Sequence, residues 1–272
     1  MHTGPLRDEL LAKADSMKVL PSLNTVVSEV LRVMNDNNSS VNQLSSVVRY
    51  DQAFSAKIIS IANSAYYSKG WSITNLERAI TVIGFDEVRN ILMCLIFFKE
   101  ILRGWKLSQA DLAALWTHSL SVTCAVKILA CRTVTADPEE AFTASILHDL
   151  GKAIFYTYGE PYREITEEAR ATGRDICALE QETFGIDHQE VGYRMSVKGR
   201  LPAKFLTVIR SHHGRSEAKE PLPDLVRVAD RFVENPDADL GADGMVLRRE
   251  KDLITSETKR ISELLGVIDA GR

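Results

Sequence analysis

Apolar residues recur along nearly the whole chain at intervals of three and four positions, the period of an α-helix, and strand-like alternation is nearly absent. Residues that cap helices stand before several of these runs. Ser40 with Gln43 and Thr74 with Glu77 have the spacing of a capping box, and Gly84 stands where the helix after Thr74 should end. The pattern therefore predicts an all-α fold.

The predicted helices fall into two packed lobes, separated by the polar stretch "RGWKLSQ". We predict an N-terminal helical lobe over residues 17–105, whose first helix runs from Ser22 through Met34. A second helical lobe is expected over residues 106–215. Residues 216–272 are expected to supply helices that complete this second lobe.

Length and composition describe a soluble globular protein. The chain has 272 residues, of which 45% are hydrophobic and 26% are charged, and its formal net charge is −4. It has no basic tract of the kind that binds nucleic acid or a membrane surface, and the longest apolar run, Ile91–Phe98, is too short to cross a bilayer. The N-terminus lacks the apolar core of a signal peptide. The four cysteines are widely spaced, which favours buried free thiols. We therefore expect a cytoplasmic protein that does not enter a membrane.

The candidate chemistry rests on histidines, since five of the six lie between residues 118 and 213. His118 falls within an apolar helical stripe, and "ILHDLGKAIF" places His148 and Asp149 in a helix that Pro138 is expected to start. A single buried histidine is more often a core residue than a ligand. Several buried ionisable groups on separate helices need a shared partner, because each costs free energy when it leaves water unpaired. A divalent metal ion would satisfy them together.

We predict that seven side chains converge in one pocket as metal ligands. They are His118, His148, Asp149, His188, His212, His213 and Asp230. Imidazole and carboxylate ligands suit one or two ions of iron, manganese, nickel or zinc (Fe, Mn, Ni or Zn).

Residues 18–215 carry motifs that, in order, closely resemble those of HDOD domains. Besides residues 20–93, these are "LWTHSLSVTCAVKILA", "EEAFTASILHDLGKAIFY", "DHQEVGYRM" and "LPAKFLTVIRSHHG". The order of His118, His148 with Asp149, and Asp230 is similar to the ligand order of the HD superfamily of metal-dependent phosphohydrolases. The resemblance implies that the second lobe has the helical HD fold and that the protein serves bacterial signal transduction.

His188 and the pair His212–His213 resemble the additional histidines of two-metal members of that superfamily, such as the HD-GYP cyclic-dinucleotide phosphodiesterases. The residues that follow, "GRSEAKEPLP", do not contain the Gly-Tyr-Pro loop of those enzymes. This departure argues against hydrolysis of cyclic dinucleotides.

Three functions remain open. The one we favour is a regulatory module that acts through protein partners of a signalling pathway and retains a metal site. The second is a metal-dependent phosphohydrolase, with a nucleotide or cyclic nucleotide as substrate; Asp149, which could bridge two ions, and Lys152 would then be its catalytic residues. The third is DNA binding by a helix-turn-helix at residues 41–63. The acidic net charge disfavours it, as does a single basic residue, Lys57, in the would-be recognition helix.

Overall fold

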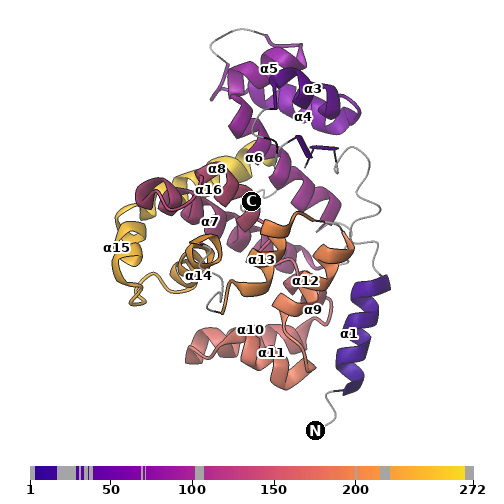
Figure 1. Cartoon of the computed structure of the whole chain (residues 1–272), viewed down its shortest axis with the longest axis vertical. Helices are drawn as coiled ribbons and strands as arrows, with labels where there is room; N and C mark the ends of the chain where they lie inside the picture. Colours follow the sequence, from indigo (N-terminus) through magenta and orange to yellow (C-terminus); the bar gives the residue numbers. More distant parts are fainter. Residues whose placement is uncertain are drawn as a thin grey trace. The chain divides into compact units, whose positions relative to one another are not determined.

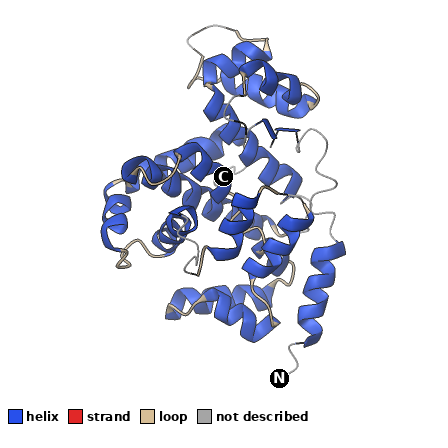
Figure 2. Ribbon diagram, viewed as in Figure 1, coloured by secondary structure: helices blue, strands red, loops and turns tan. Residues whose placement is uncertain are grey.

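The computed structural model is helical wherever it has regular structure, and no strand occurs in the part of the chain it describes (Figure 1). Figure 2 shows the same absence of strands. The all-α prediction is confirmed. The described residues are 4–16, 29–30, 32–33, 36, 39–68, 70, 72–101, 107–199, 201–214 and 221–266.

Contacts within the chain group it into two compact units. The first unit comprises residues 1–19 and 97–259, and the second unit comprises residues 20–96 and 260–272. The domain boundaries predicted from the sequence, after residues 105 and 215, stay a prediction. Residue 105 and most of the predicted helix from Ser22 to Met34 lie outside the described residues.

The described part of the second unit is built from short helices, and side chains cap three of them. Ser40 caps the first with the predicted capping box, in which its side chain and that of Gln43 bond reciprocally to the backbone, and Asp51 caps the next. The helices are α3 (Val41–Val48), α4 (Gln52–Ala62), α5 (Leu76–Ile83) and α6 (Phe85–Leu95). The π-helical stretch that follows α6, η1 (Ile96–Ile101), belongs to the first unit from residue 97 on. Gly84 ends α5 with a φ of 99°, a conformation that glycine adopts readily.

The predicted capping box of Thr74 and Glu77 is wrong by one residue. Asn75 caps α5 instead, and its side-chain oxygen accepts the N–H of Arg78 at 3.1 Å. Asparagine is at least as good a cap as threonine. Glu77 is engaged elsewhere, because its carboxylate accepts the hydroxyl of Ser45 at 3.1 Å and pairs with Arg49.

The first unit is organised around its longest helix, α7, which Ser108 caps. Helices α8, α9, α14 and α15 pack against α7, whereas α1 packs against α9, α11 and α12. The bounds are α1 (Gly4–Ser16), α7 (Gln109–Thr133), α8 (Pro138–Ser145), α9 (Lys152–Tyr156), α10 (Glu160–Thr172), α11 (Ile176–Phe184), α12 (His188–Lys198), α13 (Ala203–Ser211), α14 (Pro221–Glu234), α15 (Gly241–Arg249) and α16 (Lys251–Leu265), the last of which ends in the second unit.

Helix α7 is, among the described residues, the single helix that is long and apolar enough to cross a membrane. However, 56% of its most apolar window is buried within the protein. Leu115, Trp116 and Leu120 are among its fully or almost fully buried residues. We therefore interpret α7 as the core helix of the first unit.

The predicted helix through His148 and Asp149 is wrong in its extent. Helix α8 ends at Ser145, and residues 146–151 form successive turns in which N–H groups reach back three residues, such as His148 to Ser145 at 3.0 Å. These turns run directly against α12. A Cβ atom on Gly151 would lie 1.9 Å from the carbonyl oxygen of His188, so only glycine permits this approach.

Candidate metal centre

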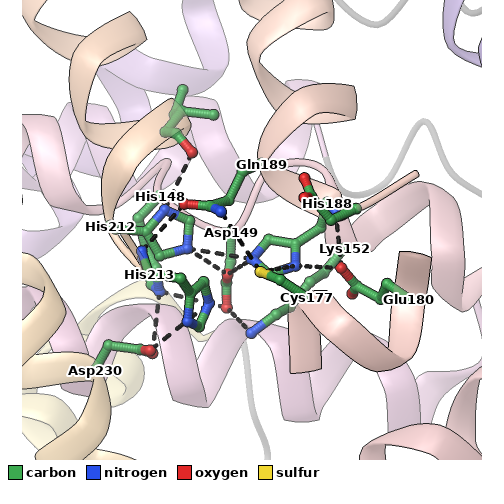
Figure 3. A network of polar contacts seen from close by, with 12 residues as sticks. His148, Asp149, Lys152, Cys177, Glu180, His188, Gln189, His212, His213 and Asp230 are labelled. Atoms are coloured by element: carbon green, nitrogen blue, oxygen red, sulfur yellow. Dashed lines mark hydrogen bonds and ion pairs between the residues drawn. The ribbon is translucent and has the colours of Figure 1, made fainter. Parts of the chain in front are cut away.

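The first unit brings all seven predicted ligand residues together. They come from five places: His118 from α7, His148 and Asp149 from the turns before α9, His188 from the first position of α12, His212 and His213 from the end of α13, and Asp230 from α14. All except His118 and His213 are buried. Figure 3 shows Asp149 in the middle of this cluster. The role of these residues as metal ligands stays a prediction.

The cluster has two halves that share Asp149. The carboxylate-rich half consists of His118, His148, Asp149 and Asp230, and the imidazole-rich half consists of Asp149, His188, His212 and His213. Within each half, one ligand-type atom of every residue lies within 4.8 Å of the others. The two oxygens of Asp149 divide between the halves, since Oδ2 approaches His118 and His148 whereas Oδ1 approaches His188 and His212.

In the carboxylate-rich half, ring nitrogens and carboxylate oxygens lie close together. His118 Nε2 lies 3.1 Å from Asp149 Oδ2 and 3.0 Å from Asp230 Oδ1, and His148 Nε2 lies 3.3 Å and 3.6 Å from the same two oxygens. Neither Nε2 atom nor either oxygen of Asp230 has a hydrogen-bond partner. Two ligands that share one ion at about 2.0–2.2 Å are themselves about 3.0–3.5 Å apart. The spacing therefore fits donors that point at a common ion.

In the imidazole-rich half, the Nε2 atoms of His188 and His212 both lie 3.4 Å from Asp149 Oδ1 and are 3.2 Å from each other. The ring of His213 packs edge-on against that of His188, with centroids 4.9 Å apart. His213 Nε2 has no hydrogen-bond partner and lies 3.9 Å from Asp230 Oδ2. His213 thus stands where the two halves meet.

The other ring nitrogen of three histidines is held by an oxygen acceptor. His148 Nδ1 bonds to the carbonyl of Ser145 at 2.9 Å, His188 Nδ1 to a carboxylate oxygen of Glu180 at 2.7 Å, and His212 Nδ1 to the carbonyl of Ile209 at 3.1 Å. Because carbonyl and carboxylate oxygens accept hydrogen bonds, the proton sits on Nδ1 in each neutral ring. The Nε2 lone pairs then face the centre of the cluster, as metal ligation requires.

The two halves differ in their affinity for protons. Burial lowers the pKa of His118 and His148, but the carboxylates of Asp149 and Asp230 outweigh it and raise both, that of His148 to about 10. In the other half, burial holds the pKa of His188 and of His213 well below the usual range. Without an ion, the carboxylate-rich half therefore attracts a proton, whereas His188 and His213 stay neutral.

Lys152 lies beside the cluster, as its position after "HDLG" suggested. It is buried at the start of α9, and its Nζ is 2.7 Å from Asp149 Oδ2. Burial lowers the pKa of Lys152, but the charge of Asp149 outweighs this effect and raises it well above the usual range. Lys152 is consequently a fixed positive charge next to the shared carboxylate.

Sequence reasoning missed the buried carboxylate behind His188. Glu180 on α11 is fully buried and accepts the backbone N–H of His188 at 2.8 Å, besides its Nδ1–H. The pattern did contain a signal. Position 180 lies four residues after Ile176 and four before Phe184, both buried, so an acidic residue stands on the apolar face of this helix.

A second missed contact fixes the turn that carries His212 and His213. The side chain of Gln189 accepts the backbone N–H of His213 at 3.1 Å and donates to the thiol of Cys177 at 3.5 Å. All four cysteines are free, as predicted, but Cys131 is exposed rather than buried.

A family model and several solved structures are similar to this chain. The HDOD domain model matches residues 20–215. An HDOD domain protein of unknown function from Geobacter sulfurreducens is 20% identical, with 88% of this chain and 91% of that chain covered and a TM-score of 0.68. A protein from Shewanella amazonensis SB2B, named as a candidate phosphohydrolase, is 22% identical with 95% of both chains covered and a TM-score of 0.62. One from Marinobacter aquaeolei VT8, named as a candidate signal transduction protein, is 17% identical with 90% of this chain and 57% of that chain covered and a TM-score of 0.67.

One curated relative matches this chain over less than half of the relative's own length. An uncharacterized protein of Treponema pallidum (strain Nichols) is 20% identical over 219 residues, which are 78% of this chain and 41% of that protein. The present chain thus spans less than half the length of the relative. The family model, in contrast, covers well over half of this chain, and the helical architecture agrees with that of the solved family member. The chain belongs to the HDOD domain family.

Proposed function

We propose that this chain is a bacterial signalling protein that acts through protein partners in the cytoplasm and holds divalent metal ions in the cluster around Asp149. The observation that carries the metal proposal is the approach of His188 Nε2 to His212 Nε2 at 3.2 Å. Both rings have their Nδ1 atoms committed to oxygen acceptors, so two lone pairs face each other. A cation between them removes the repulsion and satisfies both.

The donor arrangement supports two ions. His118, His148, Asp149 and Asp230 would hold one, and Asp149, His188 and His212 would hold the other, with His213 nearby. Imidazoles with one or two carboxylates suit Fe, Mn, Ni or Zn. Asp149 would serve both ions, because each of its oxygens faces a different half.

The signalling role rests on the family and on what the site lacks. This chain belongs to the HDOD family and resembles the HD phosphohydrolases in its ligand order, but the residues after His213 do not form a Gly-Tyr-Pro motif. A structural neighbour is named as a candidate signal transduction protein, and this supports the same role. Fold alone does not determine activity, so the role needs its own test.

Phosphohydrolase activity is the alternative, and the buried Lys152 favours it. Bound metal ions would supply Lewis acidity and an activated water. Within this chain, Lys152 Nζ would place a positive charge beside Asp149. The side chains of His118 and His213 are 22% and 12% exposed, so a phosphate-bearing substrate such as a nucleotide would reach the cluster on their side.

Turnover assays separate the two functions. The chain is loaded in turn with Mn²⁺, Fe²⁺ and Ni²⁺ and supplied with nucleotides and cyclic dinucleotides. The signalling proposal predicts little hydrolysis. Robust hydrolysis, with a kcat of about 1–10³ s⁻¹ that is abolished in Asp149→Ala, would establish the phosphohydrolase instead.

A further inference from the structure

A buried chain of hydrogen bonds leads from α10 through α11 to the imidazole-rich half. The Tyr162 hydroxyl donates to Glu180 Oε1 at 2.8 Å, and Glu180 Oε2 accepts both the backbone N–H and the Nδ1–H of His188. Tyr162, Glu180 and His188 are all fully buried. Three donors thus converge on one carboxylate that has no contact with solvent.

Glu180 approaches the His188 ring from the side away from the cluster. Nδ1 faces Glu180 at 2.7 Å, whereas Nε2 faces Asp149 Oδ1 at 3.4 Å, and Figure 3 shows the two carboxylates on opposite sides of this ring. A carboxylate in this position fixes which nitrogen carries the proton and prevents the ring from turning. In its ionised form it also strengthens the electron donation of the opposite nitrogen to a cation.

We propose that Glu180 is the positioning residue of the imidazole-rich half and sets the affinity of that half for its ion, separately from the carboxylate-rich half. This inference rests on the proposed metal function. The separation follows from the contacts, because the His148 ring is held by the carbonyl of Ser145 and not by Glu180. Only His188, among the seven candidate ligands, has a hydrogen bond to Glu180 in the described structure.

A different use of Glu180 is as a ligand itself, since Cys177, Glu180 and His188 also have donor atoms within 4.8 Å of one another. The existing hydrogen bond opposes it, because His188 Nδ1 already donates to Glu180 and has no lone pair free for an ion on that side. Glu180 therefore acts through His188.

The test compares two nearly isosteric variants. Glu180→Gln keeps an oxygen that can accept both hydrogen bonds from His188, and its amide can donate to the Tyr162 hydroxyl, but it removes the carboxylate behind the His188 ring. Tyr162→Phe is the matched control, because it removes a buried bond to the same carboxylate and leaves both bonds to His188. The stoichiometry and affinity of Co²⁺ and Zn²⁺ binding are measured by competition with a chromogenic chelator. A third variant, His118→Ala, identifies which ion belongs to the carboxylate-rich half.

The parent and Tyr162→Phe should each bind two ions. Glu180→Gln should bind the ion of the imidazole-rich half about 10–100-fold less tightly. It should keep the affinity for the ion of the carboxylate-rich half, which is the ion that His118→Ala binds less tightly. If Glu180 had a purely structural role, Glu180→Gln would lower the affinity for both ions together, and that outcome overturns the inference. Unchanged affinity for both ions, or a single ion that Glu180→Gln does not affect, overturns it as well.

Two further outcomes keep the result interpretable. If Glu180→Gln does not fold, Glu180→Asp is measured, which retains the carboxyl group but shortens the side chain. Weaker binding of the ion in the imidazole-rich half alone supports the inference, and unchanged binding of that ion opposes it. A parent that binds no ion refutes the proposed metal function, and the inference falls with it, whereas two ions insensitive to position 180 refute the inference alone.

Discussion

The Nε2 atoms of His188 and His212 lie 3.2 Å apart, while the Nδ1 atoms of the same two rings donate to Glu180 and to a backbone carbonyl. Rings that were merely packed in the core would not need both Nδ1 atoms to be held while their lone pairs converge. A cation in the space that the two Nε2 lone pairs face would account for this arrangement.

Removal of His148 should act through the bound ion. His148→Ala takes away one ligand of the carboxylate-rich half, so the protein should lose that ion and melt at a lower temperature. An ion present at about 100 times its Kd stabilises the folded state by about 2.7 kcal/mol, which is about 5–10 °C of Tm for a unit of this size. Thermal melts with and without chelator measure it. Chelator should lower the Tm of the parent much more than that of the variant, and equal shifts would contradict the prediction.

The affinity of the carboxylate-rich half for its ion should rise with pH. In the metal-free protein the pKa of His148 is raised from 6.5 to about 10, so a proton occupies the nitrogen that the ion needs. Binding that displaces one proton strengthens by about tenfold per pH unit until the pKa is reached. Competition titrations between about pH 6.5 and pH 9 would show it. A pH-independent affinity for both ions would contradict it.

The same shift predicts how the metal-free protein responds to pH. A folded-state pKa above the unfolded value means that protonated His148 stabilises the fold fully below pH 6.5, and that this contribution is lost as pH rises toward 10. Chelated protein should therefore lose stability between about pH 7 and pH 10. His148→Ala lacks the group and is the control, since its melts should change less over this range.

Gly151 should not tolerate a side chain. A Cβ at this position would lie 1.9 Å from the His188 carbonyl oxygen and 2.8 Å from the nitrogen of Gly192, both of which are backbone atoms. Gly151→Ala should push the His148–Asp149 turn away from α12 and cost about 1–3 kcal/mol or more, with loss of metal. Gly214→Ala is the control, because no atom lies within 4 Å of its Cβ position. Denaturant unfolding and metal content measure both, and equal stabilities would refute the argument.

The cap of α5 gives a test in the second unit. Asn75→Ala removes the side chain that accepts the Arg78 N–H and should lower the free energy of unfolding by about 1 kcal/mol. Thr74→Ala, next to it, should change that energy by less than about 0.5 kcal/mol, because Thr74 is exposed and does not cap the helix. A larger loss for Thr74→Ala would restore the cap assignment made from the sequence.

Local sequence signals were sufficient for most of the fold. Helical spacing, the Ser40 cap and the Gly84 end were all readable, because each depends on residues within a few positions. The candidate cluster was readable too, since His118 and His188 stand on apolar helix faces where an unpaired imidazole would be costly.

What could not be read depends on contacts between distant segments. The segment with His148 and Asp149 is apolar in pattern and reads as a helix, whereas its turns pack through Gly151 against His188, a residue far along the chain. Glu180 stands on an apolar face, but its partner is decided by which way the His188 ring points. Thr74 and Asn75 are both capping residues, and the choice between them follows from the extended backbone at Asn75.

Metal analysis of the chain purified without chelator, beside Asp149→Asn, tests the central claim most directly. Asp149 faces both halves with separate oxygens, and asparagine preserves its size while removing its charge. The proposal predicts two divalent ions per parent chain and a marked loss of both in the variant. A folded parent that binds no divalent ion, or a variant that retains the parent's full complement, would contradict it.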